Sequence, residues 1–301
     1  DVYRIGDVEE MDELGYEEYF IQTGVCLIEW STLIQEIIPD NAIEIVIEKR
    51  SLRKALITGK ITIGQEAVLR ILAIESSAVT ASVAILEDDT LVAEYTINHK
   101  MTHSQTLLPM IDEIFSMVQL KPDDVDVIAV SKGPGSFTGL RIGAATGKGI
   151  ALALDKKMVA VPTLAAMAYN LYGDSRYICP VMDARRKHLY SGIYTFDGDR
   201  LITVRDVNLE SYDELAEELA GLDGQVVLVG DGVDVAGDVL KEQLGDKCVL
   251  APAHIKTQRA GSVALLAKQM ADNGEYTDAD ELKPDYLRPS QAEREKAQHE
   301  S

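Results

Sequence analysis

Residues 131–143, Ser-Lys-Gly-Pro-Gly-Ser-Phe-Thr-Gly-Leu-Arg-Ile-Gly, form the junction on which the predicted fold depends. The preceding residues 126–130, Asp-Val-Ile-Ala-Val, are apolar after the aspartate and rich in β-branched side chains, a pattern that predicts a buried strand. The Gly-Pro-Gly at 133–135 then breaks the chain, because glycine permits positive φ and proline fixes φ. From Gly139 onward we expect a helix, so the stretch is a strand, a tight loop and a helix in succession.

Three interpretations of this loop compete. A Walker A phosphate loop ends in Gly-Lys-Ser/Thr, whereas Lys132 lies before the glycines. A nucleophile elbow needs Gly-x-Ser-x-Gly, whereas the order here is Gly-Ser-Phe-Thr-Gly. The third interpretation is a structural turn in which Ser136 or Thr138 caps the helix, with or without an anion at the helix N-terminus.

The eleven residues from Gly133 to Gly143 resemble the signature of the TsaB (YeaZ) family. Four further stretches resemble other motifs of that family: the opening strand at 70–77, the first helix at 103–109, Asp-Ala-Arg at 183–185 and the ending Pro-Asp-Tyr-Leu-Arg at 284–288. The resemblance covers residues 69–290. Glu75 stands where an Asp is common in the family.

The order of elements predicted from periodicity agrees with this resemblance. We expect strands at 70–75, 81–86 and 91–97, a helix at 104–118, a strand at 126–131, a helix at 140–154, a strand at 157–161 and a helix at 163–172. A similar order follows, with strands at 177–182, 189–196 and 201–209, a helix at 212–219, a strand at 225–229 and helices at 233–243 and 262–271. The predicted fold class is therefore α/β, with the duplicated βββαβα domain of the actin/Hsp70/sugar-kinase superfamily.

Residues 1–64 have a different character. A buried strand is predicted at 24–28, and Glu29 follows it. A carboxylate at the end of a buried strand is costly unless it meets a donor or a metal, so a cap, a salt bridge and a metal site all remain open. Residues 8–30 resemble part of the TsaE (YjeE) ATPase family, which implies that Glu29 helps bind Mg²⁺ beside ATP and that Arg53 lies near a nucleotide contact.

This first segment lacks a phosphate loop, since residues 1–68 contain no Gly-x-x-x-x-Gly-Lys-Ser/Thr. We therefore expect a partial P-loop NTPase-like α/β segment that does not hydrolyse ATP; Mg²⁺ and ATP belong to the complete TsaE-like domain only. Closing strands are predicted at 42–47 and 55–63. The chain begins without Met, so we expect a processed product or, more in keeping with the missing loop, a fragment. The short junction at 64–67 suggests a natural fusion or a read-through between adjacent coding regions. The expected domains are 1–64, a junction at 65–68, subdomains at 69–175 and 176–290, and a polar tail at 291–301.

Composition limits the function further. The net charge of −21 over 301 residues argues against the chain gripping RNA by itself, because Lys and Arg supply most of that affinity. The three cysteines include no Cys-x-x-Cys pair, so neither a disulfide framework nor a thiolate metal site is indicated. No apolar run is long enough to span a bilayer, and we expect a cytoplasmic protein.

Candidate site residues in the TsaB-like part are few. In active members of the superfamily an acid and hydroxyls on the first hairpin meet Mg²⁺ and phosphate; here Glu75-Ser-Ser-Ala stands there without the glycine that admits phosphate. We therefore predict no catalytic residue and no cofactor for residues 69–301. Asp183 and Arg185 form either an internal ion pair or a partner contact.

The helix after the signature loop carries a small residue every fourth position, at Gly139, Gly143, Gly147 and Ala151. Glycine costs about 0.5–1 kcal/mol in a helix interior, so a close neighbour is expected to offset it. That neighbour is either the helix 104–118 of this chain or a partner molecule. We predict the partner, with Leu107 and Ile111 in the same interface.

The family resemblance implies a role in making threonylcarbamoyladenosine in tRNA. It implies a non-catalytic scaffold that pairs with a TsaD-like transferase, works with a TsaE-like ATPase, forms a homodimer in isolation and meets tRNA only through the complex. A small-molecule kinase of the same superfamily and a peptidase remain as alternatives.

Overall fold

The computed structural model describes residues 43–51, 54–61 and 68–287. The chain divides into two units, residues 1–68 and 69–301. In the first unit the described part is a two-stranded antiparallel sheet of β1 (Ile43–Ser51) and β2 (Lys54–Ile61), which confirms the two strands predicted there. Glu29 and Arg53 lie outside the described residues.

The second unit contains two five-stranded sheets of the same design. The strands of the first sheet are β3 (Arg70–Glu75), β4 (Ala81–Glu87), β5 (Thr90–Ile97), β6 (Val127–Gly133) and β7 (Lys157–Pro162). Their order is β5-β4-β3-β6-β7, in which β3 pairs antiparallel with β4 and parallel with β6. The middle residues of the central strands, 71–74 in β3 and 127–130 in β6, are all apolar because both faces of the sheet are covered.

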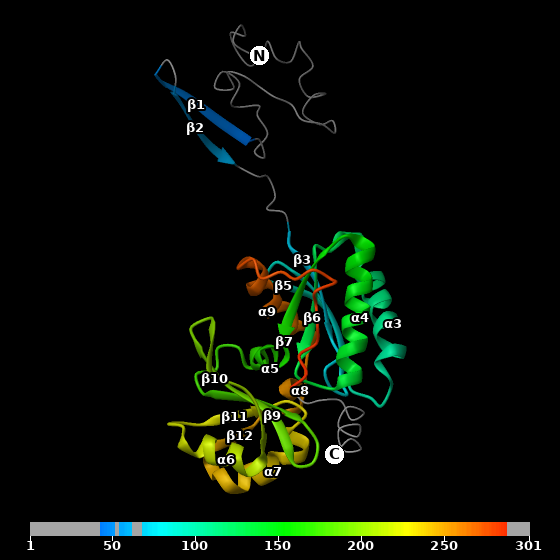
Figure 1. Ribbon diagram of the computed structural model, residues 1–301, viewed down its shortest axis with the longest axis vertical. Coiled ribbons are helices and arrows are strands. Elements are labelled where there is room, and N and C mark those ends of the chain that lie inside the picture. The colour runs from blue at the N-terminus through cyan, green and yellow to red at the C-terminus, as the bar shows by residue number, and fades with distance from the viewer. Residues whose placement is uncertain (1–42, 52–53, 62–67, 288–301) are drawn as a thin grey trace, which may run out of the picture. The chain divides into compact units, whose positions relative to one another are not determined.

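The helices of the first half lie on either side of this sheet (Figure 1). They are α3 (His103–Val118), α4 (Phe137–Leu154) and α5 (Thr163–Ala168). Leu72 and Ile74 of β3 pack with α3 and α4, whereas the alternate residues Ile71 and Ala73 face the other side. This period of two is the expected consequence of the strand pleat.

The second half repeats the arrangement with the order β10-β9-β8-β11-β12. Its strands are β8 (Tyr177–Asp183), β9 (His188–Asp197), β10 (Arg200–Ser211), β11 (Val226–Val229) and β12 (Cys248–Leu250). Its helices are α6 (Tyr212–Gly221), α7 (Val233–Leu244) and α8 (Ala253–Lys256). The same strand order and pairing in both halves confirm the duplicated α/β fold predicted from the sequence.

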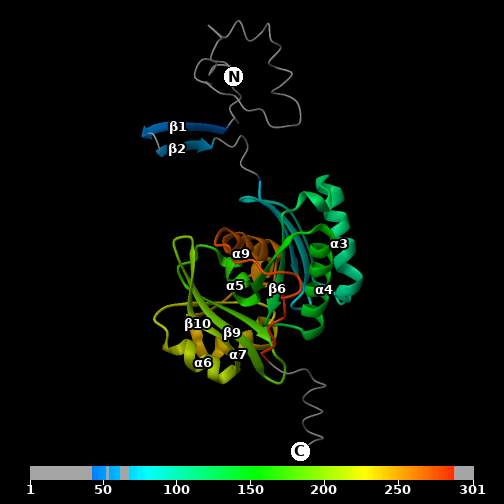
Figure 2. The same cartoon turned by 45° about the horizontal axis from the view of Figure 1, so that its top comes forward.

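Several details differ from the sequence prediction, two of them in the second half. The three-residue strand β12 was not predicted, because so short a run carries no periodicity. The last helix, α9 (Ala260–Asp272), was predicted to continue the second unit but packs across β3 and β4 of the first sheet. Its buried residues, among them Val263 and Ala267, join the core cluster on that face, and Figure 2 shows α9 beside the first sheet.

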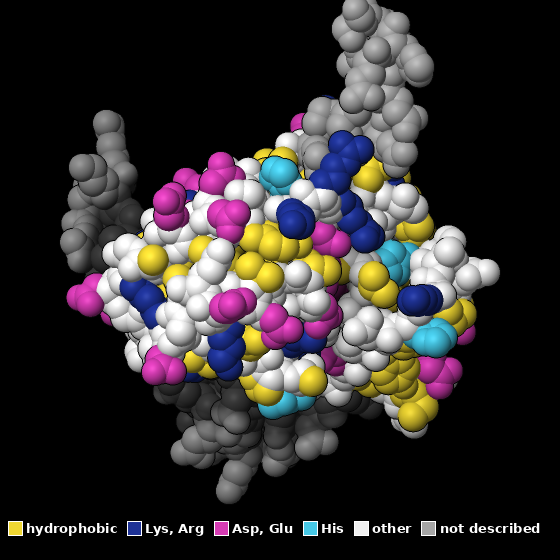
Figure 3. Space-filling view, turned by 90° about the horizontal axis from the view of Figure 1, so that it is seen from below, with side chains coloured by type: hydrophobic (Ala, Val, Ile, Leu, Met, Phe, Trp, Pro, Cys, Tyr) yellow, Lys and Arg dark blue, Asp and Glu magenta, His cyan; other side chains and the backbone are white. Residues whose placement is uncertain are grey.

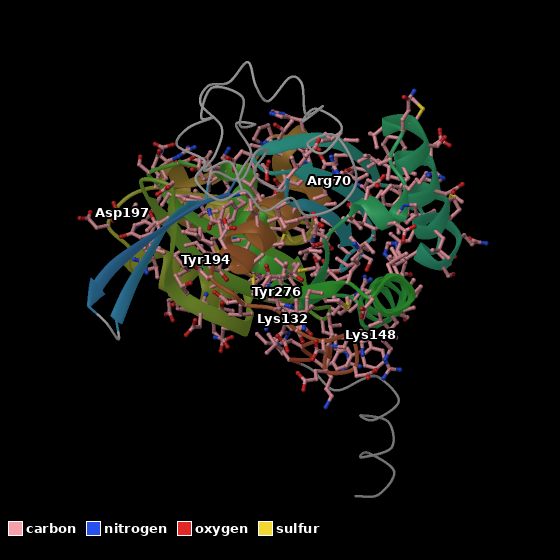
Figure 4. The ribbon with its side chains drawn as sticks, turned by 90° about the horizontal axis from the view of Figure 1, so that it is seen from above. Arg70, Lys132, Lys148, Tyr194, Asp197 and Tyr276 are labelled. Carbon is pink, nitrogen blue, oxygen red and sulfur yellow. The ribbon has the colours of Figure 1, made fainter. Side chains whose placement is uncertain are left out.

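The segment after α9 returns along the first half as well. Thr277 pairs with Met158 in β7, and Leu282 is buried in the core under α3 and α4. Further on, the Asp285 N–H donates to the Lys132 carbonyl at 2.6 Å, and the two side chains form an ion pair at 3.0 Å. We call residues 277–287 the C-terminal strap; Figure 4 shows Lys132 beside it.

Candidate functional site

The signature loop lies between β6 and α4, and two other segments of the chain pack against it. Ser136 caps α4, since its Oγ accepts from the Gly139 N–H at 3.3 Å. At Gly133, where φ is +125°, a Cβ would lie 2.6 Å from the Asp285 carbonyl oxygen of the strap. The turn between β3 and β4, residues 76–80, is called the first hairpin below. A Cβ on Gly135 would lie 2.5 Å from the carbonyl oxygen of Ser77 in this turn. The two glycines are therefore needed for close packing, which favours the structural-turn interpretation of this loop.

Glu75 ends β3 at the first hairpin and is buried. One carboxylate oxygen accepts from the Ser77 N–H at 2.6 Å, and the other accepts from the Ser131 hydroxyl. Burial raises the pKa of Glu75 above its ordinary value, although both hydrogen bonds oppose that change. Its acceptor capacity is thus directed to the chain itself.

Two backbone carbonyl groups of the first hairpin also have partners within the chain. The Ser77 carbonyl accepts from the Ser136 N–H at 2.6 Å, and His103 Nε2 lies 2.7 Å from the Ala78 carbonyl oxygen. The Ser76 hydroxyl donates to the Gly139 carbonyl at 2.9 Å. Hairpin, loop and helix start therefore form one bonded unit.

The opposite wall of the site comes from the second half. Asp183 ends β8; it accepts from the Arg185 N–H at 2.8 Å and forms an ion pair with that side chain at 3.3 Å. The internal ion pair left open above is therefore present. Asp231, after β11, accepts from Gln258 Nε2 at 2.6 Å, and its burial raises its pKa.

A cleft of about 760 Å³ separates the two walls. It lies where the carboxyl ends of β3, β6, β8 and β11 meet, the usual place for ligands in open α/β sheets. Its lining combines the first hairpin, the start of α4, the turn after β8, the start of α7 and the strap. Glu75 is not part of that lining. In residues 43–51, 54–61 and 68–287, no group of three or more His, Cys, Asp or Glu side chains could hold a metal ion.

The residues predicted to face a partner lie inside the protein. A Cβ on Gly139 or Gly143 would lie 2.1 or 2.2 Å from oxygens of Ser76. A Cβ on Gly147 would lie 2.5 Å from a methyl of Val130 in β6. The small-residue face of α4 thus packs on β3, its hairpin and β6, with His103 of α3 beside Gly139, so its neighbour is the chain itself and not the expected partner.

The other three predicted interface residues are buried too. Ala151, Leu107 and Ile111 belong to the core cluster between the first sheet and its two helices. An apolar helical face shows that a residue will be covered, but not whether its own chain or another molecule covers it.

Sequence reasoning missed the role of the C-terminal strap at the cleft. The ring centroid of Tyr286 lies 4.5 Å from that of Phe137, and its hydroxyl accepts from Arg141 Nε at 3.1 Å. The guanidinium of Arg141 also lies 4.0 Å from the Phe137 ring centroid. The motif at 284–288 was noted above as a resemblance, but no periodic pattern connects it with α4.

Comparison with known proteins identifies the family. The family model for TsaD, tRNA N6-adenosine threonylcarbamoyltransferase, matches residues 90–296, and that for TsaE, a threonylcarbamoyl adenosine biosynthesis protein, matches residues 1–57. The tRNA threonylcarbamoyladenosine biosynthesis protein TsaB of Bacillus subtilis is 32% identical over 228 residues, which are 75% of this chain and 96% of that protein. The chain belongs to the TsaB (YeaZ) family. TsaB of Escherichia coli is also 32% identical, over 73% of this chain and 95% of that protein.

A solved structure supports the same conclusion. YeaZ from Pseudomonas aeruginosa superposes with a TM-score of 0.64 at 26% identity and covers 73% of this chain and 100% of that one. By contrast, the threonylcarbamoyltransferase of Kosmotoga olearia aligns over only 35% of its own length, at 34% identity. The chain therefore covers the two TsaB proteins almost completely but only about a third of that transferase.

Proposed function

We propose that this chain acts in tRNA threonylcarbamoyladenosine biosynthesis as a non-catalytic TsaB-like subunit that pairs with a TsaD-like transferase. The near-complete coverage of two TsaB proteins supports the assignment to this process. The observation that carries the non-catalytic role is the closed first hairpin. Because Glu75 and the carbonyls of Ser77 and Ala78 already bond to the chain, these acceptors are not available to a metal ion in the cleft.

The exposed side of α3 and α4 offers a surface for the transferase. The two helices start side by side, since a Cβ on Gly139 would lie 3.2 Å from the His103 ring, and they contact each other. Met117 and Leu152 lie thirteen or fourteen residues further along, at the other end of the pair. They are 67% and 63% exposed, which makes them suited to burial against a partner.

The double variant Met117→Glu/Leu152→Glu tests this surface. We expect it to keep the wild-type melting temperature and to lose co-elution with the cognate transferase subunit, because two charges would be buried without partners. Leu91→Glu/Val204→Glu changes exposed apolar residues elsewhere and serves as the matched control. Unimpaired pairing of the first variant would show that the transferase binds another surface.

The kinase alternative makes a different prediction for the cleft. A sugar-kinase-like enzyme would bind ATP with Mg²⁺ there, whereas the closed hairpin supports no such binding. Titration calorimetry of the chain with ATP and Mg²⁺ separates the two, and micromolar binding that depends on Asp183 would favour the kinase.

The TsaE-like segment carries a separate proposal. The family match over residues 1–57 supports Glu29 as a Mg²⁺ ligand and Arg53 as a nucleotide contact of a complete ATPase domain. Grafting the phosphate-loop segment of a TsaE relative ahead of Asp1 should produce ATP hydrolysis that Glu29→Gln abolishes. Full activity of that variant would exclude the metal role.

Location and assembly are proposals as well. Within the described parts of the chain no helix is both long and apolar enough to cross a membrane. We propose a cytoplasmic protein that forms a homodimer in isolation, works with a TsaE-like ATPase and meets tRNA through the complex. Light scattering of the isolated chain tests the dimer, and a monomer mass at micromolar concentration would exclude it.

A further inference from the structure

The turn between β8 and β9 combines an unusual backbone with an unusual charge. Arg185, Arg186 and Lys187 have φ values of +68°, +56° and +60°, so three consecutive residues occupy the left-handed region. The turn is closed by the Ala184 N–H, which donates to the His188 carbonyl at 3.0 Å, and by the His188 N–H, which donates to the Arg185 carbonyl at 3.2 Å. We call residues 185–187 the basic tip.

The backbone of the basic tip does not explain its sequence. Left-handed conformations crowd the Cβ of an L-residue against its carbonyl oxygen, and glycine or asparagine relieves that crowding. The turn at the opposite end of β9 uses glycine for this purpose, since Gly198 has φ of +62°. The tip instead holds two arginines and a lysine in the same conformation. The side chains, rather than the turn, must therefore account for these residues.

The charge of the tip is only partly neutralised. Arg185 pairs with Asp183, yet its side chain remains 83% exposed. Arg186 and Lys187 are exposed and form no ion pair with any residue in 43–51, 54–61 or 68–287. A chain of net charge −21 thus presents three consecutive cations, of which Arg185 and Arg186 belong to the lining of the cleft.

The geometry of the tip suits a polyanion better than a single small anion. Consecutive residues of a helical turn point about 100° apart, so the three side chains diverge. Divergent cations reach separate phosphates of a polymer, and an arginine fork matches the geometry of a phosphate. Such contacts position a nucleic acid without reading its sequence.

We propose that the basic tip, Arg185-Arg186-Lys187, contacts the phosphate backbone of the substrate tRNA when the chain is paired with its transferase. This inference rests on the proposed function. Three cations on an acidic chain are not sufficient to bind RNA, but they add to the affinity that a partner subunit supplies. Each phosphate contact steepens the logarithmic salt dependence of binding by about 0.7–0.9.

The test uses the full chain, the cognate transferase subunit, purified threonylcarbamoyl-adenylate and unmodified tRNA. For Arg186→Glu/Lys187→Glu we expect the KM for tRNA to rise roughly tenfold with kcat retained, and the salt slope to fall by about 1.4–1.8, twice the value for one phosphate contact. Arg200→Glu/Lys241→Glu, two charge reversals elsewhere in the second half, is the matched control and should leave both quantities unchanged.

A second variant separates charge from folding. Arg186→Gly/Lys187→Gly removes the cations while it relieves the left-handed backbone, so the melting temperature should be kept while KM rises. Arg186→Lys should retain most of the wild-type KM. An unchanged KM and salt slope in the Glu and Gly variants would overturn the proposal, as would loss of binding to the adenylate rather than to tRNA. Absence of tRNA modification with the wild-type chain would instead refute the proposed function.

Discussion

Glu75 illustrates how a residue at an expected ligand position can be diverted to internal bonding. In this chain its carboxylate links the end of β3 to Ser131 in β6 and to the Ser77 N–H of the following turn. A buried carboxylate with hydrogen-bond donors is tolerated, yet burial still disfavours its charged form. Its pKa in the folded protein is therefore raised, while in the unfolded chain it is ordinary.

This difference predicts how stability changes with pH. Because the folded state holds the Glu75 proton more tightly, stability falls as the pH rises from the ordinary Glu value of 4.5 towards the raised pKa. Glu75→Gln should remove that loss, since an amide can accept from Ser77 and donate to Ser131. Thermal melts of both proteins between pH 4.5 and 8 should therefore diverge in favour of the variant. Parallel curves would mean that Glu75 is charged in the folded protein.

The sequence predicted where Glu75 lies, at the end of the strand 70–75, and β3 confirms that position. The bond from Ser131 could not be foreseen, because it joins residues 56 positions apart through the pairing of two parallel strands. The basic tip was missed for a similar reason, since three positive φ values at non-glycine residues have no sequence signal.

Helix α4 contains glycines of two kinds. Gly139 lies against the first hairpin, where an added Cβ would meet the Ser76 backbone oxygen at 2.1 Å. Gly149 lies in the same helix with open space around its Cβ position. Identical substitutions at these two positions therefore have opposite consequences.

We expect Gly139→Ala to destabilise the protein by about 1–3 kcal/mol, because backbone atoms must move to admit the methyl group. Gly149→Ala should stabilise it by about 0.5–1 kcal/mol, since alanine is the better helix former. Urea denaturation of both variants measures the difference. A similar effect at the two positions would mean that α4 does not pack closely on the hairpin.

The spacing of these residues was sufficient to predict a close neighbour, but not its identity. The close packing of any backbone against a stripe of small residues offsets the free-energy cost of glycine in a helix. That backbone can belong to a strand, a hairpin or a partner helix. Here β3, β6 and the hairpin take that place, so the interface predicted at Gly139, Gly143 and Gly147 was wrong. The same ambiguity applied to α9, whose apolar stripe was evident while the sheet that it covers was not.

Charge dominates the behaviour of the molecule towards nucleic acid. The chain carries 50 acidic and 29 basic residues, and on the face shown in Figure 3 acidic side chains are spread among the basic ones. The field of such a surface repels a phosphate backbone at long range. The basic tip is a local exception, too small to reverse it.

We therefore expect no gel shift of tRNA by the isolated chain at physiological salt. Addition of the cognate transferase subunit should produce a shift. The Glu variant of the basic tip should weaken that shift, and its loss of affinity should be larger at low salt than at 0.15 M, because the variant makes fewer phosphate contacts and therefore has the shallower salt dependence. Tight binding of tRNA by the isolated chain would contradict the assignment of the RNA contact to the assembly.

The repeated βββαβα order was predicted correctly because each half has clear local patterns: alternating residues in the strands, turn-forming residues between them, and apolar residues along one face of each helix. What could not be predicted is how the two halves exchange elements. Helix α9 and the C-terminal strap follow the second sheet in the chain yet complete the first. The order of elements in the sequence predicts which neighbouring strands pair, but it does not predict that a late segment packs against an early sheet.

Because α9 and the C-terminal strap are translated last, the first sheet is completed only after the whole second half has been synthesised. When residues 70–162 have emerged, the first sheet lacks the cover of α9 on one face, and Ile71 and Ala73 remain open to water. The second half can complete its own sheet before the first half does, although it is translated later. The nascent chain thus carries an apolar sheet face through more than a hundred codons, from β6 to α9, and is exposed to chaperones or to self-association over that interval.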